Sequence, residues 1–261
     1  MSILKIENLS ILFGGLRAVG NLDLTINRGE LVGLIGPNGA GKTTVFNILT
    51  GVYRPTEGKI FYAGDESETP VNIVGKKPYQ ITRMGMARTF QNIRLFKDLS
   101  VADNVRIARH FNVKYKSFQA IFRTPRFFSE EADLDRKVME LLELFDIQGK
   151  AAELAKNLPY GEQRKLEIVR ALATNPKLLL LDEPAAGMNP QETQELMRLI
   201  QFIREKFKLT ILLIEHDMKL VMGICERIYV LDYGQLIAEG APDEIKTNPR
   251  VIEAYLGEEV S

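Results

Sequence analysis

The sequence predicts an α/β fold in which a parallel sheet flanked by helices is interrupted by a mostly helical insertion. Short apolar runs alternate with helical patterns at both ends of the 261-residue chain. Parallel sheets produce this order because crossover helices join their strands. A glycine-rich turn joins one apolar run directly to a helix, whereas the middle of the chain has helices and loops. We therefore expect a sheet core from residues 1–84 and 171–261, with the insertion at 85–170.

The N-terminal part alternates apolar and polar residues as β-strands do. One or two strands are expected around Ile6, Leu9 and Ile11, and others at Leu22–Ile26, Leu31–Ile35 and Lys59–Tyr62. Leu31–Ile35 is apolar throughout, which is typical of a buried strand. We expect an antiparallel β region here that leads into the parallel core.

From Pro78 the pattern changes to helices and loops. Ser100–Asp103 forms a capping box ahead of a helix through about His110, and a second helix is expected over Glu130–Phe145. Its apolar residues fall near one face: Leu134, Val138, Leu141, Leu142 and Phe145. Between the helices, residues 111–128 are rich in aromatic and basic residues and are interrupted by Pro125.

The C-terminal part returns to alternating strands and helices. The expected elements are a strand at Leu178–Leu181, a helix at Gln191–Phe207, a strand at Thr210–Ile214, a further helix, and a strand at Ile228–Leu231.

Composition narrows the class of protein. The chain has 34 basic and 34 acidic residues, so its charge does not predict nucleic-acid binding. Cys225 is the only cysteine, which excludes an internal disulfide and suits a reducing cytosol. No signal-peptide pattern is present, and the longest apolar runs have strand length. We expect a chain that does not cross a bilayer by itself.

The glycine-rich turn fits the phosphate-binding pattern G-x-x-x-x-G-K-[ST]. It comprises Gly36, Pro37, Asn38, Gly39, Ala40, Gly41, Lys42, Thr43 and Thr44. It lies between a buried-strand pattern and a helix expected at Thr44–Leu49, so backbone N–H groups and the helix N-terminus can meet a phosphate. Lys42 would reach the β- and γ-phosphates, and the Thr43 hydroxyl would ligate Mg²⁺. A turn without ligand is the alternative, which the Lys-Thr pair argues against.

Two adjacent acids end the apolar run Leu178–Leu181. A buried strand delivers Asp182 to its carboxyl edge beside the phosphate loop, where it can hold Mg²⁺ directly or through water. Glu183 then lies within reach of an attacking water and can act as general base. An ordinary strand exit with two solvated acids is the alternative, and the phosphate loop argues against it.

These motifs resemble those of ABC-type ATPase cassettes over nearly the whole chain. The phosphate loop, Gln91, Leu158–Gln163, Asp182-Glu183 and His216 occur in that family's order and spacing. The segment Leu158-Pro-Tyr-Gly-Glu-Gln163 stands where the family's LSGGQ signature does. The stretches 88–96 and 214–220 resemble in particular the ATP-binding subunits of bacterial branched-chain amino-acid importers.

The resemblance implies a role for each matching residue. Phe13 matches the aromatic that stacks on adenine, Gln91 the glutamine that senses metal and water, and His216 the histidine at the γ-phosphate. The implied metal ligands are Thr43, Gln91 and Asp182, and the implied catalytic residues are Lys42, Gln91, Glu183 and His216. Taken alone, Phe13 would suit a core and His216 a hydrogen-bonded structural position.

The signature segment departs from the family pattern. Tyr160, Gly161 and Glu162 are implied to contact the ATP held by a second cassette, at the start of a helix expected over Glu162–Thr174. Pro159 stands where serine is usual and has neither a hydroxyl nor a backbone N–H. The loop 185–190, implied to cross the dimer interface, has Asn189 where many members have aspartate.

The resemblance implies an ATPase motor of an importer for branched-chain amino acids that uses ATP and Mg²⁺. Its implied partners are a second cassette and transmembrane permease subunits, with peripheral contact at the cytoplasmic face of the inner membrane. Urea or amide import, lipopolysaccharide export and a soluble ABC ATPase remain alternatives. A P-loop kinase or GTPase would leave Leu158–Gln163 and His216 without roles. The sequence does not identify the transported solute.

Positive charge is concentrated in one segment. Residues 76–126 contain twelve Lys or Arg and two acids, Asp98 and Asp103. A solvated basic face with core aromatics is one interpretation. The other is a docking segment whose aromatics fill pockets on membrane subunits and whose bases meet acidic groups or anionic headgroups.

Overall fold

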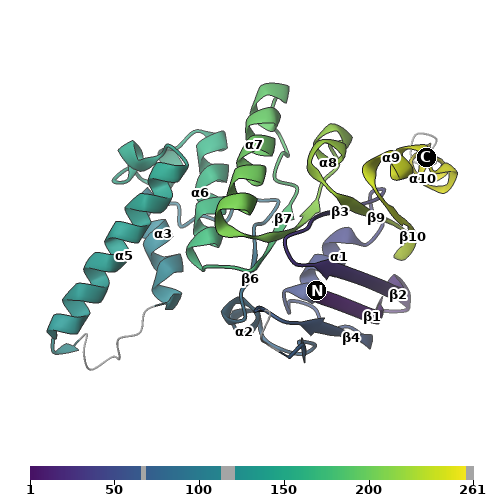
Figure 1. The fold of residues 1–261 in the computed structure, drawn as a ribbon, viewed down its shortest axis with the longest axis horizontal. Helices are drawn as coiled ribbons and strands as arrows, with labels where there is room; N and C mark the ends of the chain where they lie inside the picture. Colours follow the sequence, from purple (N-terminus) through teal and green to yellow (C-terminus); the bar gives the residue numbers. More distant parts are fainter. Residues whose placement is uncertain (66–68, 113–120, 257–261) are drawn as a thin grey trace. The chain divides into compact units, whose positions relative to one another are not determined.

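The computed structural model describes residues 1–65, 69–112 and 121–256 (Figure 1). The chain forms two compact units, Met1–Gln91 with Lys177–Ser261, and Asn92–Pro176. Lys114, Tyr115, Lys116 and Phe118 of the aromatic and basic segment lie outside the described residues.

The first unit contains two sheets. The antiparallel sheet has the order β2-β1-β4-β5, formed by β1 (Ser2–Phe13), β2 (Leu16–Asn27), β4 (Glu57–Tyr62) and β5 (Val71–Asn72). The second sheet has the order β10-β9-β3-β8-β7-β6, formed by β3 (Leu31–Ile35), β6 (Met86–Arg88), β7 (Leu178–Asp182), β8 (Thr210–Ile214), β9 (Arg227–Asp232) and β10 (Gln235–Gly240). Its strands pair in parallel except for β10, which is antiparallel to β9.

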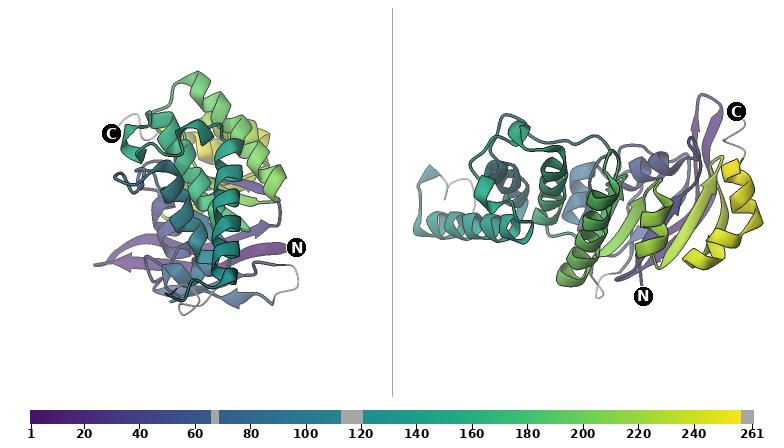
Figure 2. Two further views of the ribbon diagram at one scale, coloured as in Figure 1. Left: turned by 90° about the vertical axis from the view of Figure 1, so that its left-hand side faces the viewer. Right: turned by 90° about the horizontal axis from the view of Figure 1, so that it is seen from above.

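The first unit contains helices between its strands and two more after the last strand. They are α1 (Lys42–Leu49), α2 (Pro78–Arg83), α7 (Pro190–Phe207), α8 (Met218–Ile224), α9 (Pro242–Thr247) and α10 (Pro249–Leu256). In Figure 2 the two C-terminal helices lie beside β10.

The central strands are apolar because both of their faces are covered. Every residue of β3, β7 and β8 is buried, as is usual for a parallel sheet between layers. Full burial of one leucine or isoleucine contributes roughly 1.5–3 kcal/mol. These strands therefore form the stable centre of the sheet, and polar residues follow them at the sheet edge.

Side chains from β9 hold the two sheets together. The Tyr229 hydroxyl and the Arg227 guanidinium both donate to the Thr25 carbonyl oxygen in β2, each at 2.8 Å. Burial raises the pKa of Tyr229 to about 12, so its hydroxyl keeps the proton that it donates.

The second unit is helical. It contains α3 (Val101–Arg109), α5 (Pro125–Leu144) and α6 (Tyr160–Ala173), with short 3₁₀ turns at His110–Asn112, Gln148–Lys150 and Ala155–Asn157. Half of the predicted capping box is present at the start of α3: the Ser100 side chain accepts a hydrogen bond from the Asp103 amide, while the Asp103 carboxylate accepts from the Ser100 hydroxyl at 2.6 Å. The predicted apolar face of α5 is confirmed: Leu134, Val138, Leu141, Leu142 and Phe145 are all buried.

The predicted α/β class is confirmed, and several local predictions need correction. Pro125 begins α5 rather than interrupting the chain, because proline suits the first helical turn and Thr124 caps it. Residues 86–88, expected among helices and loops, form the sheet strand β6. The phosphate-loop helix begins at Lys42, two residues earlier than expected. Of the helices in the described part of the chain, none is both long and apolar enough to cross a membrane.

Candidate active site

The carboxyl ends of three neighbouring strands lie in one row. Leu34 of β3 pairs with Ile214 of β8, and Ile214 pairs with Asp182 of β7. The segments that follow these strands therefore leave the sheet at the same edge. They are the glycine-rich loop, the pair Glu215-His216 and the loop that begins with Glu183.

Two glycines of the loop cannot be replaced without moving the backbone around them. Gly36 has φ +148°, and a Cβ there would lie 2.0 Å from the Leu231 carbonyl oxygen. Gly41 has φ +100°, and its Cβ would lie 2.7 Å from the Ala18 carbonyl oxygen. The loop is thus pressed against β2 and β9, which fixes its N–H groups before α1 begins.

Lys42 lies across this loop. Its side chain is only 5 % exposed, and its ammonium donates to the carbonyl oxygens of Gly36 (2.6 Å) and Pro37 (2.7 Å). A Cβ at Gly39 would meet no atom within 4 Å, so the loop is open on that side. Thr43, next along the helix, is exposed. A cation above an open loop of backbone N–H groups at a helix N-terminus fits a phosphate.

Glu183 joins the ends of two other segments. Its Oε1 lies 2.7 Å from His216 Nε2, and its Oε2 accepts from Gln91 Nε2 at 2.5 Å. Glu183 has φ +45°, the left-handed region. The structure therefore brings together three residues that the sequence predicts to be catalytic.

Asp182 is held by an arginine. The Arg88 guanidinium donates to Asp182 Oδ2 at 2.5 Å, and the two side chains are only 5 % and 4 % exposed. Arg88 ends β6, which pairs with β7. Arg88 is not among the site residues predicted from the sequence.

Glu215 is a second functional candidate that sequence reasoning missed. Its buried carboxylate accepts hydrogen bonds from the amides of Ala185 (2.6 Å) and His216 (3.0 Å). Burial raises the pKa of Glu215, the amides of Ala185, Asp217 and His216 oppose this, and the charge of Glu183 adds to it. Glu215 thereby ties the loop after Glu183 to the backbone of His216. An acid directly after a run of four apolar residues was the available sequence signal.

Phe13 lies at the end of β1, next to a second aromatic residue. Its side chain is 43 % exposed and meets Tyr53 edge to face, with 5.3 Å between ring centroids. This exposure rules out the core position that Phe13 alone would suit, and leaves an apolar surface on which a planar ring can stack.

Tyr160, Gly161 and Glu162 belong to the second unit and form the first turn of α6. The helix begins two residues earlier than expected, and Pro159 at its N-cap provides no side-chain hydrogen bond. Glu162 is paired with Lys150 at 2.6 Å. Tyr160 is 47 % exposed, and its hydroxyl accepts from Arg164 at 3.4 Å.

The loop 185–190 ends in a helix cap. Asn189 accepts hydrogen bonds from the amides of Gln191 and Glu192, and Glu192 accepts one from the Asn189 amide. Asparagine thus fills the same cap that an aspartate would provide.

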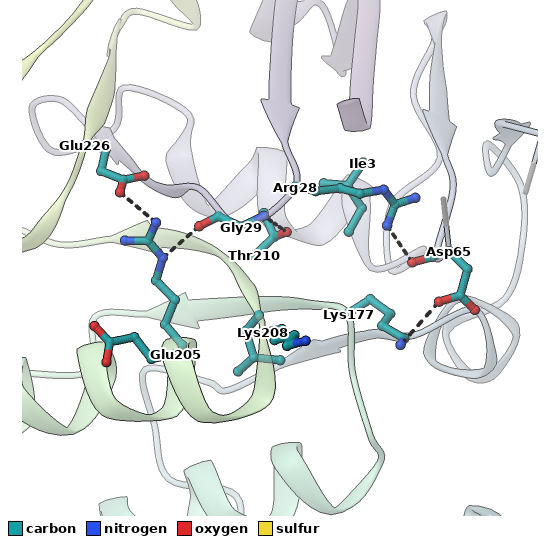
Figure 3. Close-up of a pocket in the computed structure, with 12 residues that line it drawn as sticks. Ile3, Arg28, Gly29, Asp65, Lys177, Glu205, Lys208, Thr210 and Glu226 are labelled. Carbon is teal, nitrogen blue, oxygen red and sulfur yellow. Dashed lines mark hydrogen bonds and ion pairs between the residues drawn. The ribbon is translucent and has the colours of Figure 1, made fainter. Parts of the chain in front are cut away.

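A pocket of about 950 Å³ lies at the amino edge of the parallel sheet (Figure 3). Its charged side chains pair with one another, Lys177 with Asp65 at 3.2 Å and Arg204 with Glu226 at 2.6 Å. Arg28 donates to the carbonyl oxygens of Ala63 and Gly64. The described lining includes none of the sequence-predicted site residues.

Comparison with known proteins agrees with the motifs. A family described as ABC transporter matches residues 19–186, and one described as branched-chain amino acid ATP-binding cassette transporter matches residues 235–261. The chain is 48 % identical to the high-affinity branched-chain amino acid transport ATP-binding protein LivG of Escherichia coli, over 98 % of both chains. It is 45 % identical to the corresponding protein BraF of Pseudomonas aeruginosa, again over 98 % of both.

A solved structure agrees with the fold. The ADP conformation of MJ1267, an ATP-binding cassette of an ABC transporter, superposes with a TM-score of 0.82 at 30 % identity, over 98 % of this chain and 99 % of that one. The resemblance seen in the motifs is confirmed, because these matches cover almost the whole sequence. The chain therefore belongs to the ABC transporter family and is one of its ATP-hydrolysing cassettes.

Proposed function

We propose that this chain is the motor subunit of an importer for branched-chain amino acids, and that Glu183 is its general base. The observation that carries the catalytic assignment is the position of the Glu183 carboxylate between Gln91 and His216 at the carboxyl edge of the sheet. The cargo assignment is supported by the names of the relatives and by the match at residues 235–261.

ATP would bind along the first unit. The amides of residues 36–44 and the Lys42 ammonium would hold its phosphates, and Phe13 would stack on its base. Lys42 would exchange the carbonyl oxygens of Gly36 and Pro37 for phosphate oxygens. Thr43, Gln91 and Asp182 would hold Mg²⁺, which needs oxygen ligands and keeps waters and phosphates among them.

Hydrolysis requires a group that takes a proton from water. Mg²⁺ bound with ATP would neutralise charge on the phosphates. Glu183 would accept the proton of the attacking water on its carboxylate. Gln91 and His216 hold both carboxylate oxygens by hydrogen bonds, so they orient the base. His216 would in addition donate towards the γ-phosphate.

The second unit would complete the site of another cassette. In this proposal the insertion of residues 85–170 presents Tyr160, Gly161 and Glu162 to the ATP of the partner in a head-to-tail dimer. Since Pro159 offers no donor, the contact would come from the N–H groups and the dipole of α6. The Lys150 ammonium neutralises Glu162, which reduces the repulsion that a carboxylate at this position would exert on phosphates.

The insertion would also dock on the permease at the cytoplasmic membrane face. Ile121, Phe122 and Phe128 are 75 %, 76 % and 56 % exposed, and exposed apolar side chains of this size favour a protein contact. Arg126 pairs with Glu130 at 2.9 Å, so part of the basic charge is already balanced.

Charge reversal tests this docking. Replacing Lys114, Lys116, Arg123 and Arg126 by Glu should leave ATP binding by the isolated subunit unchanged and weaken copurification with the membrane partner. Wild-type assembly should weaken as salt rises, because exposed charges are screened over about 10 Å at 0.1 M. Copurification equal to wild type would leave these residues as a solvated basic face.

Uptake measurements test the cargo. Cells that lack this subunit and keep its neighbouring membrane subunits should lose import of radiolabelled leucine, isoleucine and valine. The wild-type chain and Glu205→Gln, a control in the lining of the amino-edge pocket, should restore import, whereas Glu183→Gln should not. Normal uptake in the deletion strain would reject the branched-chain assignment and favour urea or amide import, or an export process.

A further inference from the structure

Arg88 occupies an unusual place for a charged residue. It ends the edge strand β6, and its side chain is almost completely buried together with that of Asp182. A buried charge is tolerated when it is paired and hydrogen-bonded, and one left unpaired in such a place is strongly unfavourable. The two residues are therefore an electrostatic unit.

The Arg88 guanidinium contacts the helix α1 with its second terminal nitrogen, in addition to its contact with the strand β7. Nη1 donates to Asn47 Oδ1 at 2.8 Å and to Thr50 Oγ1 at 3.3 Å, both in the last turns of α1 or just after it. Its Cζ lies over the rings of Phe46 and Phe90, 5.4 Å and 4.9 Å from their centroids. Because a guanidinium is a rigid planar fork, it holds the phosphate-loop helix and the Asp182 carboxylate in a fixed relation.

The ion pair with Arg88 gives the two carboxylate oxygens of Asp182 different surroundings. Oδ2 is bound to Arg88, whereas Oδ1 accepts no hydrogen bond from any residue that the structure describes. With Arg88 in place, the pair carries no net charge. The neutral pair then attracts a divalent cation only weakly when no nucleotide is bound. The negative charge needed to hold the cation comes with the phosphates of the nucleotide.

We propose that Arg88 is the resident counter-ion and positioning residue of Asp182, and that it makes the site take up its divalent cation together with the nucleotide rather than alone. The inference rests on the proposed function, in which Asp182 is a metal ligand. An arginine that served only to hold β6, β7 and α1 together would change the stability of the protein. It would leave the affinity for a cation without nucleotide unchanged.

Mn²⁺ binding to the full chain without nucleotide tests this, measured by electron paramagnetic resonance of free Mn²⁺. Arg88→Met removes the counter-charge and keeps an apolar side chain between the two rings. It should bind Mn²⁺ about tenfold more tightly than wild type, because the buried carboxylate has lost its compensating charge. Arg198→Met, an exposed arginine on α7, controls for the loss of one surface charge and should match wild type.

Two further variants locate the effect. Arg88→Met combined with Asp182→Asn should return to the wild-type affinity for Mn²⁺, since the carboxylate is gone. Arg88→Lys should also stay close to wild type, because it keeps the charge while losing the fork. If Arg88→Met is too unstable for titration, Arg88→Gln replaces it, because its amide keeps a donor for Asn47.

An affinity of the Arg88→Met protein equal to wild type overturns the inference, and so does a gain that persists in the double variant. A separate measurement isolates the proposed function: Asp182→Asn alone should weaken Mn²⁺-dependent ATP binding. If it does not, the metal assignment itself fails. If it does while Arg88→Met shows no gain, only the counter-ion role fails.

Discussion

The two edges of the parallel sheet carry similar residues in different settings. At the carboxyl edge, the side chains of Asp182 and Glu183 are 4 % and 12 % exposed and are held by Arg88 and His216. At the amino edge, Asp65 and Glu226 are 59 % and 53 % exposed and pair with Lys177 and Arg204 around the pocket of Figure 3. Ion pairs as exposed as these contribute little to stability and leave each charge well solvated.

This difference separates the proposed catalytic edge from a solvated one. A buried carboxylate responds strongly to the charges around it, because water does not screen them. The pocket at the amino edge is spacious, yet four of its charged side chains already form two ion pairs. The proposed catalytic site lies at the edge where acids at strand ends are buried, and this pocket lies at the other edge.

The largest difference between the two edges is expected in the rate of ATP hydrolysis, when one glutamate at each edge is replaced by glutamine. Glu183→Gln should lower the rate of ATP hydrolysis by about 10²–10⁴, because an amide cannot take a proton from water. ATP affinity should remain, and size-exclusion chromatography with ATP and Mg²⁺ should show an accumulated dimer. Glu205→Gln at the amino-edge pocket should hydrolyse ATP normally. A Glu183→Gln protein within a few-fold of wild type would remove the general base from this edge.

A lysine at each edge gives the second contrast. Lys42→Ala removes charge-assisted hydrogen bonds of about 1.5–3 kcal/mol each. Affinity for ATP should fall by about 10- to 100-fold in calorimetry, since each tenfold corresponds to roughly 1.4 kcal/mol. Lys208→Ala, also a lysine but exposed at the pocket, should bind ATP like wild type. Equal affinities for the two variants would contradict the phosphate site.

Glu215 gives a smaller effect that depends on pH. Burial raises the pKa of its carboxyl, so the folded protein holds this proton more tightly than the unfolded chain. The associated stability is present below the ordinary pKa of 4.5 and is lost as pH rises through the raised value. Glu215→Gln lacks this titration. Urea unfolding from acid to neutral pH should therefore show the wild type losing stability relative to the variant, and a constant difference would argue against a raised pKa.

The smallest effect concerns Cys225, near the amino edge. Burial raises the pKa of Cys225 to about 12, and its sulfur lies where a Cβ on Gly33 would come within 3.2 Å. Iodoacetamide at about pH 8 should modify the native protein far more slowly than the unfolded chain, whose thiol has a pKa near 8.5. Mass spectrometry follows the modification. Equal rates of modification for the native and the unfolded protein would mean that Cys225 is readily exposed to solvent by local unfolding.

Contiguous motifs made much of this structure predictable. The bounds of β8 follow from the sequence because Thr210 and the four apolar residues after it are typical of a buried parallel strand. The phosphate loop and the pair Asp182-Glu183 are likewise local patterns. Arg88 and Asp182 are 94 residues apart, and only the pairing of β6 with β7 brings them together. A three-residue strand that ends in arginine carries too few apolar residues to be recognised, so both the strand and its ion pair were missed.

At Glu183 the backbone conformation that suits the proposed catalytic role lowers the stability of the fold. A left-handed conformation costs an L-residue roughly 1–2 kcal/mol, whereas glycine adopts it freely. A sequence selected for stability alone would therefore favour glycine at position 183. Glutamate there implies that the protein gives up part of its stability to aim a carboxylate at the sheet edge. Stabilising libraries of this chain should accordingly enrich Glu183→Gly, and every such clone should be inactive.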